Sequence, residues 1–319
     1  MTLKEFLDEW RSPASTVLVH TSGSTGKPKP MLVEKKRMVA SARMTCSFLN
    51  LTDKDTALLC MPLDYIAGKM MVVRAEVVGM RLVSVKPSGH PLAEADVCKD
   101  ITFAAMVPMQ VYNSLQVEEE RERLMGIRHL IIGGGAIDKK MEAALAAFPN
   151  NVWSTYGMTE TLSHIAMRKI NGDGASAYYT PMKEIDVNAD SDGCLIIDAP
   201  QLCPNILHTN DIVEFGDNNK CFRVVGRKDN TICCGGIKIQ AERVEEILAQ
   251  YLDAPFFITK STDPKFGEIP VCVTECRDKK LLEDIFENVL PKYWIPKRIV
   301  TVERLPLTET GKPKRCGVY

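Results

Sequence analysis

Ten residues near the start of the chain, Thr21–Pro30 (TSGSTGKPKP), combine the side chains that suit binding of a polyphosphate. Gly23 and Gly26 free the backbone from the restrictions of a Cβ atom, so that successive amides can turn toward phosphate oxygens. Lys27 and Lys29 supply the positive charge that balances the phosphates. The residues expected to contact the phosphates through amides or hydroxyls are Thr21, Ser22, Gly23, Ser24, Thr25 and Gly26. The segment predicts a site for ATP.

This segment differs from the standard P-loop of nucleoside triphosphatases. That loop needs a glycine, four residues, Gly-Lys and then Ser or Thr. Here Pro28 follows Lys27, and no glycine stands five places before Gly26. The alternative interpretation is a flexible polar surface turn. Two prolines, Pro28 and Pro30, argue against it because they restrict the backbone around the lysines.

A second cluster, Tyr156–Glu160 (YGMTE), offers three different contacts to one nucleotide. The ring of Tyr156 can stack on a purine, the hydroxyl of Thr159 can bond the α-phosphate, and the carboxylate of Glu160 can bind Mg²⁺ beside the phosphates. A glycine run after the apolar residues 130–132 lets the backbone approach a flat ligand. Taken singly, both segments have structural alternatives, a turn leading into a capped helix and a flexible link after a strand. The further nucleotide contacts expected here are Gly133, Gly134, Gly135, Ala136 and Gly157.

Regular elements must position these segments, and the apolar pattern alternates between strands and helices. We expect buried strands at residues 16–19, 57–62, 82–85, 102–107 and 127–133, and helices at 38–49, 66–79 and 138–148. This alternation is typical of an α/β domain with a parallel sheet, in which Thr21–Pro30 joins a strand to a helix. From about residue 172, short segments separated by Gly, Asp and Asn indicate a small β-rich portion. An amphipathic helix at residues 241–251, with Val244, Ile247, Leu248 and Tyr251 on one face, indicates a final small unit.

Composition excludes several classes of protein. The 319 residues carry a net charge of −1, so no global electrostatic attraction toward nucleic acid or anionic membrane is expected. The 11 cysteines form no Cys-x-x-Cys pair, and we expect reduced thiols and a cytoplasmic location. No apolar run approaches the roughly 20 residues that span a bilayer. The composition is that of an ordinary globular protein, and it does not indicate an oligomeric state.

In their order along the chain, these motifs resemble the adenylate-forming superfamily, which includes acyl-CoA synthetases, peptide-synthetase adenylation domains and luciferases. The resemblance extends from about residue 16 to residue 315. It implies the adenylate-forming fold: a large α/β AMP-binding domain at residues 1–226 and a small mobile α+β lid domain at residues 227–319. The region before the phosphate-binding segment is shorter than in full-length members, which implies an N-terminally trimmed version. The resemblance also implies ATP, Mg²⁺ and coenzyme A as the reactants and cofactors.

The resemblance assigns roles in nucleotide binding to two later motifs. Thr209–Asp211 (TND) is similar to the family's Thr-Gly-Asp, whose aspartate bonds the ribose, which implies that role for Asp211. Asn210 replaces the glycine, and asparagine tolerates the left-handed geometry of a turn. Arg227 lies in a Gly-Arg-Lys-Asp motif and would contact ribose or phosphate. The alternative for that motif is a surface turn with one ion pair.

Four more residues receive roles in the conformational cycle and in catalysis. Asp229 stands at the position of the hinge, and Gly235 and Gly236 would frame the channel for the pantetheine of coenzyme A. Near the C-terminus, Leu305–Lys312 (LPLTETGK) is similar to the loop that carries the adenylation lysine. Lysine is a point charge on a flexible stem, so Lys312 can offset charge that develops between the carboxylate and the α-phosphate. The implied catalytic residues are Lys312, Thr159, Glu160 and Lys29, with Glu160 on the metal.

Several short sequence motifs resemble those of one group in the superfamily, the o-succinylbenzoate–CoA ligases of menaquinone synthesis. They are Met61–Gly68, where Asp64 or Tyr65 stands in place of the usual histidine, Val107–Gln110 and Ser163–Ile165. A substrate with two carboxylates needs a cation or several donors for the carboxylate that does not react. The candidates are Arg74, Ser163 and His164. Arg74 has the alternative of extending to the surface, and His164 that of a structural histidine.

Three functional hypotheses remain at this point. The first is an o-succinylbenzoate–CoA ligase acting on a small carboxylic acid, ATP and coenzyme A. The second is an acyl-CoA ligase or carrier-charging adenylation enzyme for another acid. The third is a nucleotide-binding protein without turnover, which the presence of Glu160 and Lys312 makes the weakest of the three. No nucleic-acid partner and no membrane span are expected.

Overall fold

The computed structural model describes residues 1–20, 30–94, 99–216, 219–307 and 313–315. The chain divides into two compact units. The first comprises Met1–Val187, Ile197–Leu207 and Phe215–Phe222, and the second comprises Asn188–Ile196, His208–Glu214 and Arg223–Tyr319. The domain boundary between residues 226 and 227 stays a prediction.

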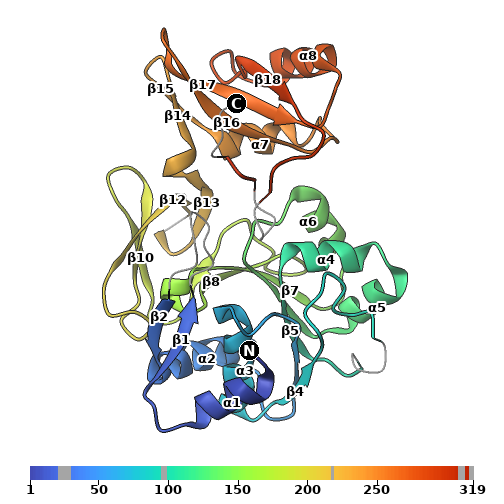
Figure 1. The fold of residues 1–319 in the computed structure, drawn as a ribbon, viewed down its shortest axis with the longest axis vertical. Coiled ribbons are helices and arrows are strands. Elements are labelled where there is room, and N and C mark those ends of the chain that lie inside the picture. Colours follow the sequence, from blue (N-terminus) through green and yellow to red (C-terminus); the bar gives the residue numbers. More distant parts are fainter. Residues whose placement is uncertain (21–29, 95–98, 217–218, 308–312, 316–319) are drawn as a thin grey trace. The chain divides into compact units, whose positions relative to one another are not determined.

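A seven-stranded sheet forms the centre of the first unit (Figure 1). In spatial order its strands are β4 (Arg81–Ser84), β3 (Thr56–Leu59), β5 (Phe103–Met106), β6 (His129–Ile132), β7 (Asn151–Gly157), β8 (His164–Lys169) and β9 (Thr180–Pro181). The strands from β4 to β7 are parallel, whereas β8 and β9 are antiparallel to their neighbours. Strands β3 and β5 are buried along their whole length, as strands covered on both faces must be. The α/β fold class predicted from the sequence is confirmed.

Helices cover both faces of this sheet. They are α2 (Lys35–Leu49), α3 (Ile66–Val78), α4 (Pro108–Leu115), α5 (Glu118–Gly126) and α6 (Lys139–Ala146). The chain moves in one direction along the sheet from β3 to β4 and in the opposite direction from β5 to β7. Since parallel crossovers are right-handed, α3 must lie on one face and α4 to α6 on the other, as Figure 1 shows. The helices α4 and α5 were not predicted, because residues 118–126 are mostly charged and show no apolar stripe.

The phosphate-binding segment connects two strands rather than a strand and a helix. Strand β1 (Thr16–His20) pairs antiparallel with β2 (Pro30–Glu34), and α2 begins directly after β2. The prediction of a strand-to-helix loop was therefore wrong. The sequence did not reveal β2 because its five residues contain a proline and only three apolar side chains. The preceding helix α1 (Leu3–Arg11) begins at a Thr2–Glu5 capping box.

The β-rich portion that follows is confirmed as a four-stranded sheet. Its strands, in spatial order, are β10 (Asp186–Ala189), β11 (Cys194–Asp198), β12 (Leu207–Phe215) and β13 (Phe222–Arg227). Glycines and turn-forming polar residues separate short strands here, as the sequence pattern indicated.

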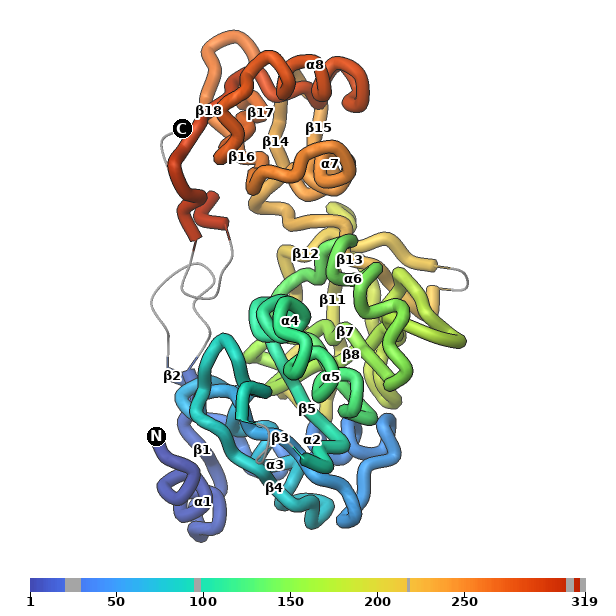
Figure 2. The backbone as a smooth tube through the Cα atoms, turned by 90° about the vertical axis from the view of Figure 1, so that its right-hand side faces the viewer, coloured from blue at the N-terminus to red at the C-terminus, as the bar shows by residue number. Residues whose placement is uncertain are grey.

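The second unit packs two helices on one face of a five-stranded sheet (Figure 2). The elements are β14 (Thr231–Cys234), β15 (Ile237–Gln240), α7 (Ala241–Leu248), β16 (Phe256–Asp263), β17 (Gly267–Thr274), α8 (Lys279–Val289) and β18 (Arg298–Thr301). Val244 and Leu248 on α7, and Leu282 and Phe286 on α8, are buried against the sheet. Tyr251 was predicted to share the buried face of α7, but the helix ends at Leu248 and the ring is exposed.

No helix among the described residues is long and apolar enough to cross a membrane.

Candidate active site

The motif Tyr156–Glu160 lies at the carboxyl end of β7. The ring of Tyr156 is half-buried, with its centroid 5.2 Å from that of Phe222 and 6.0 Å from that of Tyr179. A short 3₁₀ helix, η1 (Thr159–Thr161), follows the strand. Thr159 is buried in it, whereas Glu160 is exposed. One end of the strand thus presents an aromatic ring held by two others, and then a carboxylate open to a ligand.

Gly157 sits where β7 and β8 approach too closely for a side chain. It pairs with His164 across the two strands, and the register shifts between Tyr156 and Gly157. A Cβ atom at Gly157 would lie 2.3 Å from the carbonyl oxygen of Ser163 and 2.5 Å from the Cα atom of His164. The glycine in the motif therefore serves the contact between two strands, and it brings the nucleotide motif beside Ser163 and His164.

Replacing Gly157 by alanine is expected to destabilise the protein by about 1–3 kcal/mol, because the backbone of β8 must move away. Thermal unfolding measures the effect. Gly126→Ala is the matched control, since a Cβ there meets no atom within 4 Å and Gly126 ends α5. That change should be neutral, or stabilising by up to about 1 kcal/mol. Equal stability of the two variants would contradict the close contact.

The glycine run lies at the carboxyl end of the neighbouring strand. Gly133 follows β6 directly, and its amide donates to the carbonyl of Met106 on β5 at 3.0 Å. Gly134 has a φ of +81°, which a residue with a side chain rarely adopts. In open α/β sheets, ligands bind outside the carboxyl ends of the parallel strands. The structure therefore brings the segments 133–136 and 156–160 together at the edge where a nucleotide is expected.

The three candidate substrate residues form one hydrogen-bonded chain in the first unit. Arg74, on α3, donates to the hydroxyl of Ser163 at 2.5 Å. The Ser163 hydroxyl lies 3.3 Å from Nδ1 of His164, and Nε2 of His164 lies 3.0 Å from the hydroxyl of Thr45 on α2. Thr45 in turn donates to the carbonyl of Ser41 at 3.2 Å. If each hydroxyl donates one hydrogen bond, the series of hydrogen bonds runs in one direction from the guanidinium of Arg74 to the carbonyl of Ser41. His164 then accepts at Nδ1 and donates from Nε2, as a neutral imidazole does.

Arg74 is the unusual member of this cluster because it is buried and forms no ion pair with any residue that the structure describes. Its side chain does not extend to the surface, and its residue exposure is only 2%. Its Nε atom has no hydrogen-bond partner within the described part of the chain. Burial lowers the pKa of Arg74 to about 10. The alternative of a surface-reaching arginine is therefore wrong, and a buried cation remains whose Nε donor has no partner among the described residues.

Backbone strain occurs beside this cluster. Leu162 has a φ of +66°, a value that is a true outlier for a bulky residue, although its side chain is buried. It lies between Thr161, whose hydroxyl donates to the carbonyl of Ser163 at 2.7 Å, and Ser163 itself. Such strain concentrates at functional sites, where the surrounding structure enforces it. Here the left-handed backbone conformation of Leu162 changes the direction of the chain between η1 and β8.

His164 is neutral in the folded protein. Burial lowers its pKa well below the ordinary value, and the nearby charge of Arg74 acts in the same direction. The folded state therefore binds fewer protons than the unfolded state as the pH falls below about 6.5. Stability that is complete above this pH is lost as the pH decreases.

The expected loss from His164 is at most about 1.4 kcal/mol for each pH unit below 6.5. His164→Asn should flatten the dependence of the free energy of unfolding on pH between 5 and 7, measured by urea denaturation. His208→Asn is the control, because His208 is exposed on β12. An unchanged slope in His164→Asn would contradict a neutral buried histidine.

A second group of predicted residues lies in the second unit. Arg227, at the end of β13, donates to Asp211 at 2.9 Å and to Asp229 at 3.1 Å. Asp229 lies in η3 (Lys228–Asn230), and its carboxylate also accepts a hydrogen bond from the side-chain amide of Asn210. The segment Thr209–Asp211 was expected to form a turn, but it lies inside β12. That expectation was wrong, and Asn210 needs no left-handed geometry.

Gly235 and Gly236 form the turn between β14 and β15, rather than a strand. Their φ angles are +56° and +85°, so glycine is required by the geometry of the turn. The amide of Gly235 donates to the carbonyl of Phe266 at 2.9 Å. Their predicted role at a coenzyme A channel stays a prediction.

Other predicted residues lie outside the described part of the chain. They are Thr21, Ser22, Gly23, Ser24, Thr25, Gly26, Lys29 and Lys312. Their flanks are described: His20 pairs with Pro30 across β1 and β2, and Leu307 pairs with Pro313.

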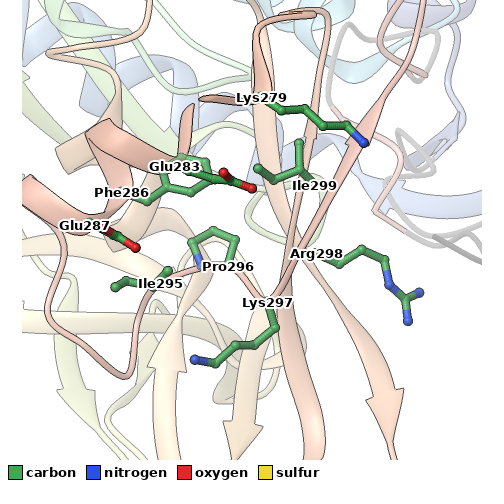
Figure 3. A pocket seen from close by; sticks show the side chains of 9 residues that line it. All are labelled: Lys279, Glu283, Phe286, Glu287, Ile295, Pro296, Lys297, Arg298 and Ile299. Atoms are coloured by element: carbon green, nitrogen blue, oxygen red, sulfur yellow. The ribbon is translucent and has the colours of Figure 1, made fainter. Parts of the chain in front are cut away.

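Hollows among the described residues include the following pair. One, of about 430 Å³, lies at the carboxyl ends of β3 and β4 and is lined by residues 61–64 of the substrate motif, the segment 84–87 and the residues 1–3. Asp64 forms an ion pair with the amino group of Met1 at 3.2 Å. The other hollow, of about 170 Å³, lies between α8 and β18 and carries charges of both signs, including Glu283 and Lys297 (Figure 3). None of the predicted site residues lines the second hollow.

Sequence reasoning did not predict the hydrogen-bonding roles of two buried polar residues in the first unit. Thr45 is buried on α2, and its hydroxyl bonds His164. Gln110 is buried, and its amide donates to the carbonyls of Cys60 and Ser88. A hydroxyl or an amide within an apolar stripe was the available signal, because such groups need partners when they are buried.

The residues present fit a nucleotide with Mg²⁺. No group of three or more His, Cys, Asp or Glu side chains within the described residues forms a metal site by itself. Mg²⁺ usually takes only one or two carboxylates and completes its shell with phosphates and water. The exposed carboxylate of Glu160, the ring of Tyr156 and the backbone at 133–136 are the groups that would hold these ligands.

Comparisons with known proteins agree with this arrangement. The model of the AMP-binding enzyme family matches residues 6–193. A solved acyl-CoA synthetase (AMP-forming)/AMP-acid ligase II-like protein from Dyadobacter fermentans is 32% identical, with a TM-score of 0.68 over 98% of this chain and 91% of that one. A 2-succinylbenzoate–CoA ligase from Listeria monocytogenes is 26% identical over 98% of this chain and 71% of its own.

One further structure supports the fold alone. The o-succinylbenzoate coenzyme A synthetase from Bacillus subtilis, solved with ATP and magnesium, has a TM-score of 0.76 at 22% identity, over 93% of this chain and 68% of that one. From the family match and the Dyadobacter relative, the chain belongs to the AMP-binding enzyme family and is an AMP-forming acid–thiol ligase.

Proposed function

We propose that the chain activates a carboxylic acid with a second carboxylate, most specifically o-succinylbenzoate, as an acyl-adenylate and transfers the acyl group to coenzyme A. The observation that carries this proposal is the buried guanidinium of Arg74, which has an unsatisfied Nε donor and no carboxylate partner within the described residues. A ligand carboxylate is the group that its geometry and charge suit best.

The energetic argument is that an unpaired buried cation is expensive. The lowered pKa of Arg74, about 10, means that burial disfavours its charged form at neutral pH. Met71 and Ser163 provide only a sulfur and a hydroxyl as neutral acceptors. A substrate carboxylate placed against the guanidinium would supply the missing charge. Strongly perturbed ionisable groups at the carboxyl edge of a sheet are candidates for function.

The relatives support the choice of acid. The Listeria protein is named for 2-succinylbenzoate, and it spans nearly the whole chain at 26% identity. Ser163 and His164, which belong to a motif typical of that group, contact Arg74 or each other. The motif at residues 61–64 lines the 430 Å³ hollow, whose size suits a small ligand.

The reaction has two steps. In the first, an oxygen of the substrate carboxylate attacks the α-phosphorus of ATP, the bond between the α-phosphorus and the oxygen that bridges it to the β-phosphate breaks, and pyrophosphate leaves. In the second, the sulfur of coenzyme A attacks the activated carbonyl and AMP leaves. Mg²⁺ neutralises phosphate charge when it is bound. In this chain, Tyr156 orients the adenine, Thr159 bonds the phosphate and Glu160 holds the metal, while Lys29 and Lys312 offset the negative charge.

Asp229 is proposed as the pivot between domains at residues 1–226 and 227–319. The contacts that hold it are weak. Its side chain is 52% exposed in an ion pair with Arg227, and exposed pairs contribute about 0–1 kcal/mol. Such contacts exchange at little cost when φ and ψ change.

Release of pyrophosphate across a panel of acids tests the proposal. The panel contains o-succinylbenzoate and 4-oxo-4-phenylbutanoate, which keeps the succinyl carboxylate but lacks the carboxylate on the ring. We expect release with the first acid, a much lower kcat/KM with the second, and thioester only when coenzyme A is added. Release with both acids at equal efficiency would contradict the dicarboxylate. Pyrophosphate release with a different acid of the panel, and with neither of these two, would contradict o-succinylbenzoate as the substrate and indicate a ligase for that other acid. No pyrophosphate release with any acid would contradict ligase activity.

A further inference from the structure

A partly buried ion pair connects α7 to the C-terminal segment of the second unit. The guanidinium of Arg315 binds the carboxylate of Glu245 with two parallel bonds, of 2.5 Å and 2.8 Å. The two side chains are only 17% and 20% exposed. Arg315 also donates to the carbonyl of Ile258 on β16, and its guanidinium lies 5.8 Å from the centre of the Phe257 ring.

The backbone on both sides of this pair is held as well. The amide of Ile258 donates to Glu245 at 2.6 Å, and the hydroxyl of Thr259 donates to the carbonyl of Arg315 at 3.0 Å. Burial opposes ionisation of Glu245 and raises its pKa despite the bonds from Arg315. The bonds to Glu245 raise the pKa of Arg315 even though burial opposes its charge. Residue 315 is therefore fixed to α7 and β16 through its side chain and its main chain.

A second set of contacts joins the segment that ends at Leu307 to the segment that begins at Pro313. Leu307 pairs with Pro313, and the amide of Lys314 donates to the carbonyl of Pro306 at 2.8 Å. The amide of Leu305 donates to the carboxylate of Glu275 at 2.9 Å. Lys312 directly precedes Pro313, and consecutive Cα atoms are about 3.8 Å apart. The chain is therefore anchored within three residues of Lys312 on its C-terminal side, at residues 313–315, and five residues before it at Leu307.

We propose that Glu245 and Arg315 are positioning residues that set the location of Lys312 for the adenylation step. This inference rests on the proposed function, since it assigns to the ion pair an effect that acts through that lysine. A charge stabilises a transition state only where its position is held in advance. A bidentate ion pair fixes the orientation of the two side chains as well as the distance between them, whereas a hydrophobic contact does not fix the orientation.

The first experiment separates the two half-reactions in Glu245→Gln, which keeps the shape of the side chain and removes its charge. We expect the rate of acyl-adenylate formation to fall by about 100-fold, the cost of a misplacement of about 1 Å. Formation of thioester from presynthesised acyl-adenylate should change less than threefold. Arg315→Lys should retain more adenylation than Arg315→Met, because it keeps the charge but loses the fork.

Two controls distinguish positioning from stability. Leu282→Ala removes a fully buried side chain of α8 from the core of the same unit. It should lower Tm at least as much as Glu245→Gln and leave adenylation near the wild-type rate below the transition. Glu245→Gln combined with Lys312→Ala should be no slower in adenylation than Lys312→Ala alone, because the pair acts through the lysine. A further loss in the double variant would overturn the proposal.

Hydrogen exchange gives a measurement that does not depend on turnover. The amide of Lys314 should exchange faster in Glu245→Gln than in Leu282→Ala, as its bond to Pro306 becomes less protected. Wild-type protection together with wild-type adenylation in Glu245→Gln would refute the inference. If Lys312→Ala abolishes adenylation but Glu245→Gln does not, only the inference fails. If Lys312→Ala leaves adenylation intact, the role of the lysine in the proposed function fails, and the inference with it.

Discussion

Lys312→Ala is expected to lower the rate of acyl-adenylate formation by about 10²–10³-fold. The physical reason is the loss of a cation at the charge that develops between the carboxylate and the α-phosphate, and such losses have this magnitude. Pyrophosphate release measures the effect. Formation of thioester from presynthesised acyl-adenylate should stay largely intact, because pyrophosphate has already left when the thiol attacks.

Lys314→Ala is the matched control for this prediction. It removes the same charge two residues away and keeps the main-chain bond from residue 314 to Pro306. Adenylation in Lys314→Ala should stay within about threefold of the wild-type rate, the variation expected for a residue outside the reacting centre. A Lys312→Ala enzyme that adenylates at the wild-type rate would remove the lysine from the mechanism.

Arg74→Met is expected to lower kcat/KM for o-succinylbenzoate by about 10²–10³-fold. The substitution leaves the second carboxylate without its cation, and loss of one partner of a buried charge pair costs about 3–5 kcal/mol. For 4-oxo-4-phenylbutanoate, which has no carboxylate on the ring, kcat/KM should change by less than about tenfold, or rise. This reversal of selectivity, measured by pyrophosphate release, is specific to recognition of the substrate.

The same substitution should increase stability in the absence of substrate. The folded pKa of Arg74, about 10, lies below its ordinary value of 12.5 because of burial. The charged form is therefore disfavoured by folding, and this cost is present in full at pH 7, below the folded pKa. Arg74→Met should raise the free energy of unfolding by about 1–3 kcal/mol. Reduced activity toward both acids with lower stability would instead indicate a structural arginine.

Much of the fold was predictable because the α/β pattern is local. Strands such as Phe103–Met106 are continuous apolar runs, and α3 lies between two of them. The helix at Glu118–Gly126 was missed because its stability depends on packing against α4 rather than on an apolar stripe. The strand β2 was missed for a similar reason, since its pairing with β1 is formed across the phosphate-binding segment.

The nucleotide motifs of the candidate site were predictable from the sequence, whereas the contacts between its elements were not. Tyr156–Glu160 and Gly133–Ala136 were recognised as motifs, and parallel strands bring their ends to one edge. The role of Gly157 was not readable from the motif, because it depends on the backbone of Ser163 across the sheet. The expected turn at Thr209–Asp211 was wrong because pairing within the sheet places these residues in β12.

The sequence by itself determined the α/β class and the order of the nucleotide motifs, since both depend on neighbouring residue types and spacing. Only the tertiary structure decided that Arg74 is buried, bonded to Ser163 and without a carboxylate partner in the described part of the chain, and that Glu245 binds Arg315. These residues lie 89 and 70 positions apart along the chain. Burial and pairing at such separations result from packing of whole elements, which the spacing of residues along the chain does not encode.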